Sequence, residues 1–152
     1  MALSPKGSRQ HAGRFNRKDT AATYYALEPQ TAYLEYQVGN PDPLPVAIVA
    51  ARIEAERIVD LVAPSTALAT PWDRWTDDWK DAKFDPTLDP ASWRCADAAL
   101  AEDCSGILFP SQVHGAGTNL VVYPEDASAG LLKFEIIDPK RAIHATMSKS
   151  TL

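Results

Sequence analysis

Short apolar runs alternate along this chain with glycine, proline and charged residues, and this pattern predicts a domain built from short strands and helices. Runs rich in β-branched and aromatic residues predict strands over residues 22–27, 57–61, 106–111, 119–123 and 131–137. The whole stretch 46–61 is strand-like, although its middle, 50–57, also fits a helix. Gly39-Asn40-Pro41-Asp42-Pro43 predicts a stop and a turn.

Three segments have the spacing of helices. Pro29 at a first helical position, preceded by Glu28, predicts a helix that extends to Val38. A second helix is expected over residues 71–84, where three tryptophans spaced i, i+3, i+7 would cover the core. A third is expected over residues 90–104, and its buried stripe would be Ala91, Trp93, Ala96, Leu100 and Cys104. The sum is an α+β fold of short mixed or antiparallel strands with about three helices.

Length and charge narrow the class of protein. The 152 residues are enough for one domain, and we expect a single domain over residues 1–152. The 15 basic and 20 acidic residues leave a net charge of −5, which argues against direct binding to nucleic acid or to a membrane surface. A few local arginines can still bind phosphate in an acidic protein.

Cysteine usage and the absence of long apolar runs favour a reducing compartment. Cys95 and Cys104 match neither a zinc spacing nor a disulfide framework, so we expect two ordinary thiols. The first residues lack the apolar stretch of a secretory signal, and no run has transmembrane length. The sequence therefore predicts a cytoplasmic protein without a membrane segment.

Familiar nucleotide signatures are missing, but one set of residues offers a different chemistry. Gly115-Ala116-Gly117 lacks the remainder of a dinucleotide fingerprint, and no Walker motif is present. The set comprises Gly13-Arg14-Phe15-Asn16, Tyr24-Tyr25-Ala26, Glu35, Phe109-Pro110-Ser111 and Asn119. It contains no evident nucleophile–base pair, so it fits acyl transfer poorly. It suits a reaction that needs a positioned anion and an electrostatic stabiliser.

The order and spacing of these residues resemble the RES-domain family, which is named for shared Arg, Glu and Ser residues. Tyr25 lies eleven residues after Arg14, and Glu35 lies ten residues after Tyr25. Pro110-Ser111, followed by Asn119, is similar to the third block of the family, and the likeness spans roughly residues 3–124. The family is similar in layout to ADP-ribosyltransferases of the diphtheria-toxin type, so the resemblance implies that fold.

The resemblance also implies a function. Family members are toxins of bacterial toxin–antitoxin pairs, and their usual partner is an Xre-type helix-turn-helix antitoxin. They act on NAD+ without a metal, and they hydrolyse it, phosphorolyse it or transfer its ADP-ribose to a protein. We slightly favour a protein acceptor, and a homodimer within the complex with the antitoxin is left open.

Cleavage of the nicotinamide–ribose bond passes through an oxocarbenium-like state, which a nearby carboxylate stabilises. Glu35 is the candidate for that carboxylate, and the arginine fork of Arg14 suits the pyrophosphate or the ribose-proximal phosphate. Tyr25 matches the family position for a ring that orients nicotinamide, while Tyr24 would point to the other face of the strand. The predicted catalytic residues are Glu35, Arg14 and Tyr25. The predicted NAD+-binding residues are Arg14, Tyr25, Ser111 and Asn119.

Two departures from the family pattern and two other interpretations accompany this hypothesis. Family members usually carry a further arginine upstream of the G-R-F motif. Arg14 lies too close to Met1 for such a residue to precede it, so the chain is either truncated or belongs to a branch that lacks this arginine. Gln112-Val113-His114 stands where a basic residue is usual. A non-catalytic binding module of the same fold, or an unrelated α+β domain, would also fit. The Trp72, Trp75 and Trp79 face would be an antitoxin-docking surface if it is exposed.

Overall fold

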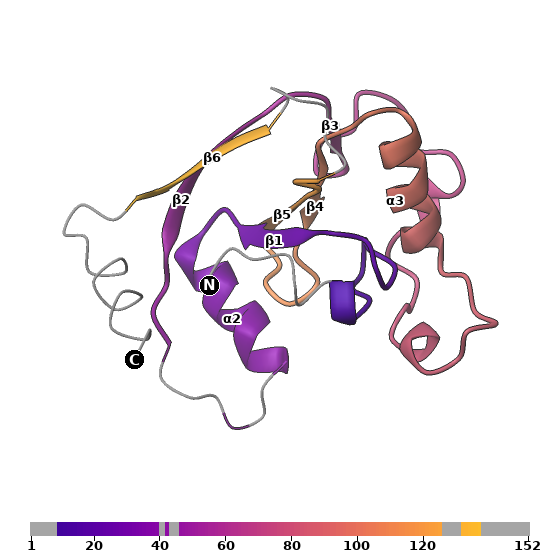
Figure 1. Cartoon of the computed structure of the whole chain (residues 1–152), viewed down its shortest axis with the longest axis horizontal. Helices are drawn as coiled ribbons and strands as arrows, with labels where there is room; N and C mark the ends of the chain where they lie inside the picture. Colours follow the sequence, from indigo (N-terminus) through magenta and orange to yellow (C-terminus); the bar gives the residue numbers. More distant parts are fainter. Residues whose placement is uncertain (1–8, 40–41, 43–45, 126–131, 138–152) are drawn as a thin grey trace.

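A computed structural model describes residues 9–39, 42, 46–125 and 132–137, and it contains two sheets (Figure 1). The larger sheet has the strand order β1 (Thr23–Ala26), β5 (Thr118–Val122), β4 (Gly106–Pro110), β3 (Ile58–Asp60). β1 and β4 each pair antiparallel with β5, whereas β3 pairs parallel with β4. The smaller sheet is the antiparallel pair of β2 (Ala50–Ala55) and β6 (Leu132–Ile137). The predicted α+β class with mixed and antiparallel strands is confirmed.

Two helices lie on different sides of the larger sheet. α2 (Pro29–Gly39) follows β1 after a short connection and lies with the β2–β6 pair, while α3 (Ala91–Ala101) lies at the opposite side of the molecule (Figure 1). α2 begins at Pro29, whose missing N–H costs nothing in a first helical turn. Within the described part of the chain, no helix is long and apolar enough to cross a membrane.

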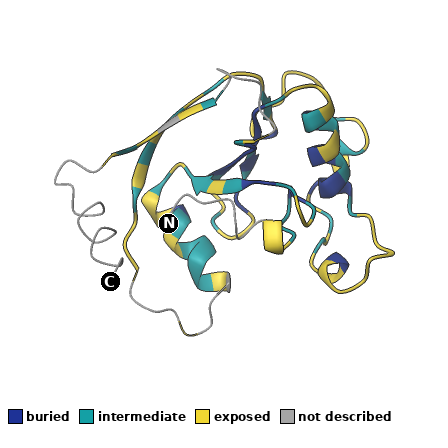
Figure 2. Ribbon diagram, in the orientation of Figure 1, coloured by how far each residue is buried: buried dark blue, intermediate teal, exposed yellow. Residues whose placement is uncertain are grey.

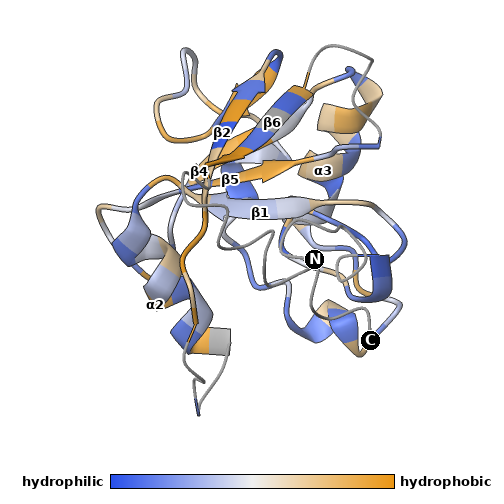
Figure 3. Cartoon of the chain, turned by 60° about the vertical axis from the view of Figure 1, so that its left-hand side comes forward, coloured by the Kyte–Doolittle hydropathy of each residue, from blue (hydrophilic) through white to orange (hydrophobic). Residues whose placement is uncertain are grey.

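The core lies between α3 and the larger sheet, where the dark blue residues of Figure 2 gather. Phe15, Trp75 and Phe109 form its aromatic centre, with ring centroids 4.8 Å apart for Phe15–Phe109 and 5.8 Å for Phe15–Trp75. Ile107 and Val121 are fully buried beside them, which agrees with the hydrophobic colours of β4 and β5 in Figure 3. Loop 13–16 is thus held against the sheet by Phe15.

The helix predicted over residues 71–84 is wrong. The segment contains two 3-10 turns, Trp72–Arg74 and Asp81–Lys83, separated by irregular backbone. The Asp78 carboxylate accepts a hydrogen bond from the backbone N–H of Lys80, a local bond that competes with helix formation. Trp75 is buried in the core, and Trp72 and Trp79 are half-buried, so the three do not form an exposed docking face.

Other boundaries differ by a few residues. The stretch 50–57 is the strand β2 and a turn at Arg57, whose φ of 55° is left-handed, so the helical alternative is wrong. α3 ends at Ala101, before the predicted 104, and Asp103 with φ 58° reverses the chain. Cys95 and Cys104 are free thiols, as predicted, and burial raises the pKa of Cys95 to about 12. The predicted surface tail from residue 140 lies outside the described residues.

Candidate active site

One oxygen of Glu35 is held by two side chains from distant parts of the chain. Ser111, directly after β4, donates its hydroxyl to Glu35 Oε1 over 2.8 Å. Asn119 in β5 donates from Nδ2 to the same oxygen over 2.6 Å. Both donors are buried, with 6% and 7% of their surface exposed. Among the described residues no donor is bonded to the second oxygen, Oε2, which leaves it for a ligand.

The orientation of Ser111 is set by the turn that follows it. Its Oγ accepts the backbone N–H groups of Val113 (3.1 Å) and His114 (2.9 Å), and its own N–H donates to Gly117 O (2.8 Å). Because Oγ accepts from these two amides, its single proton is directed to Glu35. The carboxylate is therefore tied to the sheet through a rigid turn rather than through a mobile side chain.

Arg14 lies in loop 13–16 with its guanidinium close to two indole rings. Its Cζ is 5.7 Å from the Trp75 ring and 6.0 Å from the Trp79 ring, and its Nη1 donates to Trp75 O over 3.3 Å. Desolvation lowers the pKa of Arg14, and interactions with Tyr24, then Glu35 and Asp78, oppose that shift. An arginine stays charged at neutral pH even so. The result is a half-buried cation that interacts with the Glu35 carboxylate.

Tyr24 and Tyr25 point to opposite faces of β1, as neighbours in a strand must. Tyr24 pairs in register with the buried Val121, and its hydroxyl accepts the N–H of Phe15 (2.8 Å) and donates to Asn16 Oδ1 (2.9 Å). Burial of that hydroxyl raises the pKa of Tyr24, although 40% of the residue surface is exposed. Tyr24 therefore lies on the face that also carries Arg14.

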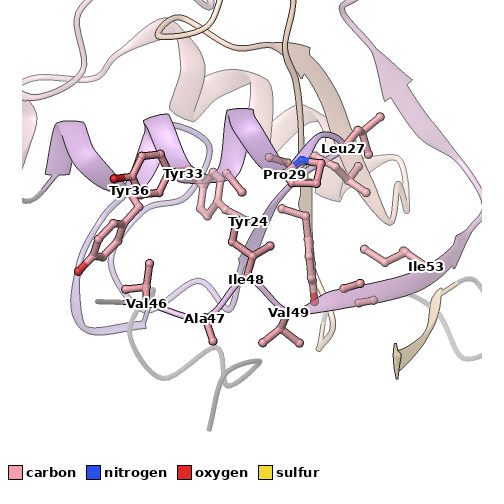
Figure 4. Close-up of a pocket in the computed structure, with 16 residues that line it drawn as sticks. Tyr24, Leu27, Pro29, Tyr33, Tyr36, Val46, Ala47, Ile48, Val49 and Ile53 are labelled. Carbon is pink, nitrogen blue, oxygen red and sulfur yellow. The ribbon is translucent and has the colours of Figure 1, made fainter. Parts of the chain in front are cut away.

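Tyr25 pairs with Leu120 on the other face of β1. Both Tyr25 and Tyr24 line a groove of about 790 Å³ between α2 and the segment that leads into β2, where Figure 4 labels Tyr24. Apolar and tyrosine side chains dominate the lining, among them Tyr33, Tyr36 and Ile48. Of the five predicted site residues, Glu35, Ser111 and Asn119 are joined by hydrogen bonds, and Arg14 lies within electrostatic range of Glu35. The structure does not bring Tyr25 to them.

Sequence reasoning included Tyr24 in the candidate set but assigned no role to it. A signal was present in Gly13, because a Cβ at that position would overlap Asn16 Oδ1 and lie 2.8 Å from the Tyr24 hydroxyl. Such a close approach to the Asn16–Tyr24 hydrogen bond explains why glycine precedes Arg14. We call Arg14, Tyr24, Glu35, Ser111 and Asn119 the polar cluster.

The donor set of the polar cluster suits sugar and phosphate groups. A carboxylate with one unbonded oxygen can hold a ribose hydroxyl, and an arginine can bind an oxyanion. In the residues that the structure describes, no three or more His, Cys, Asp and Glu side chains group as metal ligands. The structure is thus a small α+β protein whose polar cluster has the donor and acceptor groups that sugars and phosphates require.

Comparison with known proteins gives the family. The sequence model of the RES domain matches residues 1–144, and the chain belongs to the RES domain family. A solved structure with a similar fold is that of the M. tuberculosis MbcT–MbcA toxin–antitoxin complex, with a TM-score of 0.52 and 21% identity. That match covers 98% of this chain and 83% of the other. No curated protein sequence matches this chain. The predicted family is therefore confirmed, and so is its fold.

Proposed function

We propose that this protein cleaves the nicotinamide–ribose bond of NAD+ and transfers ADP-ribose to a protein acceptor. The observation that carries the proposal is the Glu35 carboxylate, whose Oε1 is held by Ser111 and Asn119 while Oε2 has no partner among the described residues. A pre-oriented carboxylate beside a half-buried arginine fits an NAD+-consuming member of the RES domain family.

The reaction needs stabilisation of positive charge on the ribose. The bond between C1′ and the pyridinium nitrogen breaks, and its electron pair leaves with nicotinamide. Glu35 stabilises the oxocarbenium-like state, and its Oε2 accepts a hydrogen bond from a ribose hydroxyl. The acceptor then forms a bond to C1′ and releases its proton. Because Ser111 and Asn119 already hold Oε1, little reorganisation is required in the transition state.

Arg14 supplies the site for the anionic part of the substrate. Its guanidinium makes one hydrogen bond, to Trp75 O, within the described residues, so further N–H groups are left for a phosphate oxygen. The ring role that we predicted for Tyr25 fits Tyr24 better, because Tyr24 lies on the same face of β1 as Arg14. Among the described residues, Tyr25 makes no hydrogen bond to the polar cluster that would support the role we predicted for its ring.

A protein that consumes NAD+ has to be blocked until it is needed, so we also propose a cognate antitoxin of the Xre-like helix-turn-helix type. The similar fold in the MbcT–MbcA toxin–antitoxin complex supports a toxin with a protein partner. The antitoxin would cover the polar cluster and exclude NAD+. The cytoplasm, which holds the NAD+ pool of a bacterial cell, is the proposed place of action.

The acceptor can be identified by following nicotinamide release and ADP-ribose together. Antitoxin-free protein is incubated with NAD+, first alone, then with inorganic phosphate, then with cell extract, and modified proteins are sought by mass spectrometry. We expect release to rise with extract and ADP-ribose adducts to appear on protein, both lost in Glu35→Gln. Free ADP-ribose with protein alone would show hydrolysis instead, and release that depends on phosphate would show phosphorolysis. No release in any arm would contradict the enzyme and favour a binding module.

A further inference from the structure

A second chain of hydrogen bonds connects the start of α2 to the turn that orients Ser111. Glu28 Oε2 accepts the backbone N–H of Thr118 over 3.0 Å and the hydroxyl of Thr31 over 2.7 Å. Thr31 Oγ1 also lies 2.8 Å from His114 Nδ1. Thr31 is fully buried, so this contact is shielded from water. None of these three side chains belongs to the polar cluster.

The donors and acceptors along this series of hydrogen bonds determine which ring nitrogen of His114 carries a proton. The backbone hydrogen bond from Thr118, and then the side-chain bond from Thr31, lower the pKa of Glu28 and keep it ionised at neutral pH. An ionised carboxylate only accepts, so the single hydroxyl proton of Thr31 is donated to Glu28. The contact between Thr31 Oγ1 and His114 Nδ1 therefore needs a proton from the ring. In the neutral imidazole, Nδ1 carries the hydrogen and Nε2 the lone pair.

The His114 ring and backbone act on two different elements. The ring is bonded to α2 through Thr31, and the backbone N–H donates to Ser111 Oγ over 2.9 Å. Gly117 makes the close approach feasible, because a Cβ there would overlap Thr31 Oγ1 and crowd His114 Nδ1. The N–H of Gly117 donates to His114 O over 2.8 Å and closes the turn. His114 is thus held on both sides while Ser111 bonds Glu35.

We propose that His114 is a positioning residue for Glu35, acting through Ser111. The Glu28–Thr31 pair holds its ring as the Nδ1–H tautomer, and the ring fastens turn 111–114 to α2. Glu35 is carried by the same helix, so the two ends of the Ser111–Glu35 bond have one rigid support. This inference rests on the proposed role of Glu35 and adds residues that the reaction does not touch.

Kinetics of nicotinamide release separate positioning from binding. We expect His114→Ala and Thr31→Val each to lower kcat about 10-fold, as loss of a supporting hydrogen bond does elsewhere, with little change in KM. His114→Asn should recover most of the rate, because its amide places an N–H near the Nδ1 position. Gln112→Ala, an exposed neighbour on the same turn, is the matched control and should behave like the parent. Thermal melting of every variant shows that it is folded.

The tautomer is read directly from the ¹⁵N shifts of the neutral imidazole in the parent and in Thr31→Val. The Nδ1–H form in the parent, weakened in Thr31→Val, is expected, and an Nε2–H form in the parent would overturn the inference. So would a parental kcat in folded His114→Ala and Thr31→Val, or an equal loss in His114→Asn and His114→Ala. If Glu35→Gln keeps the parental rate, the proposed function fails instead, while the tautomer result still stands by itself.

Discussion

The two faces of β1 differ sharply although they are one residue apart. On the Tyr24 face, Ser111 and Asn119 are hydrogen-bonded to the Glu35 carboxylate, which attracts Arg14 electrostatically. The 790 Å³ groove, which both Tyr25 and Tyr24 line, is instead formed by apolar and tyrosine side chains (Figure 4). Size and apolar lining alone would place a ligand in the groove.

The comparison teaches that the groups with defined chemistry, rather than the concave volume, mark the reactive site. Breaking a glycosidic bond needs a charge held in place, and positioned charges occur on the Tyr24 face. The groove offers contact area, but of the polar cluster it is lined by Tyr24 and not by the charged Arg14 and Glu35. Substitutions in the polar cluster and in the groove should therefore affect catalysis differently.

The largest difference is expected for catalysis when the two faces are altered separately. Glu35→Gln removes the charge that stabilises the oxocarbenium-like state, and kcat for nicotinamide release should fall on the order of 10²–10³-fold. Ile48→Ser, an exposed position in the groove, should leave kcat at the parental value. Steady-state release assays on both folded variants check this. Equal losses in the two variants would remove the distinction between the faces.

A smaller loss is expected when the anion-binding fork is replaced by a point charge. Arg14→Lys keeps the positive charge but loses the planar donors, and kcat/KM should fall about 10- to 100-fold, the worth of one or two charge-assisted hydrogen bonds. NAD+ titrations of the release rate provide the measurement. A variant with unchanged kcat/KM would show that phosphate is bound elsewhere.

The neighbouring tyrosines should also differ in their contribution to stability. Tyr24→Phe removes the hydroxyl that bonds the Phe15 N–H and Asn16, and the free energy of unfolding should fall by about 1–2 kcal/mol. Tyr25→Phe removes no hydrogen bond seen among the described residues and should stay within about 0.5 kcal/mol of the parent. Urea unfolding monitored by circular dichroism tests the pair. The reverse order would contradict the assignment of the two faces.

The smallest effect is on the pH dependence of stability. Burial raises the pKa of Tyr24 above its ordinary value of 10.0, so the folded state keeps a proton that the unfolded state loses. This contribution is complete below pH 10 and declines as the pH rises above it. Tyr24→Phe should reduce the alkaline decline of the unfolding free energy more than Tyr25→Phe does. Identical slopes in both variants and the parent would show that Tyr24 is solvated.

Local pattern predicted most elements of the fold. The runs that became β1, β4 and β5 were found because their residues favour strands, and α2 because a proline begins it. The segment 71–84 was misjudged since the tryptophan spacing imitates a helix. In fact Trp75 is placed by the core, and short turns with aspartate hydrogen bonds shape the backbone. Tertiary packing overrode the local periodicity.

The site was predictable through the family resemblance rather than through local pattern. Glu35 bonds Ser111 and Asn119, which lie 76 and 84 positions away, and no short-range signal reports such a contact. The choice between Tyr24 and Tyr25 depends on which face of β1 meets loop 13–16. The alternation of side chains along a strand predicts that Tyr24 and Tyr25 point to opposite faces, but it does not predict which of them faces the loop.

The most direct test of the account is a crystal structure of Glu35→Gln with intact NAD+. The variant keeps the shape of the carboxylate but lacks its charge, so the dinucleotide should persist. The account predicts the nicotinamide ribose at residue 35 and a phosphate at Arg14, on the Tyr24 face of β1. NAD+ bound in the groove between α2 and Ile48, with the polar cluster unoccupied, would contradict it.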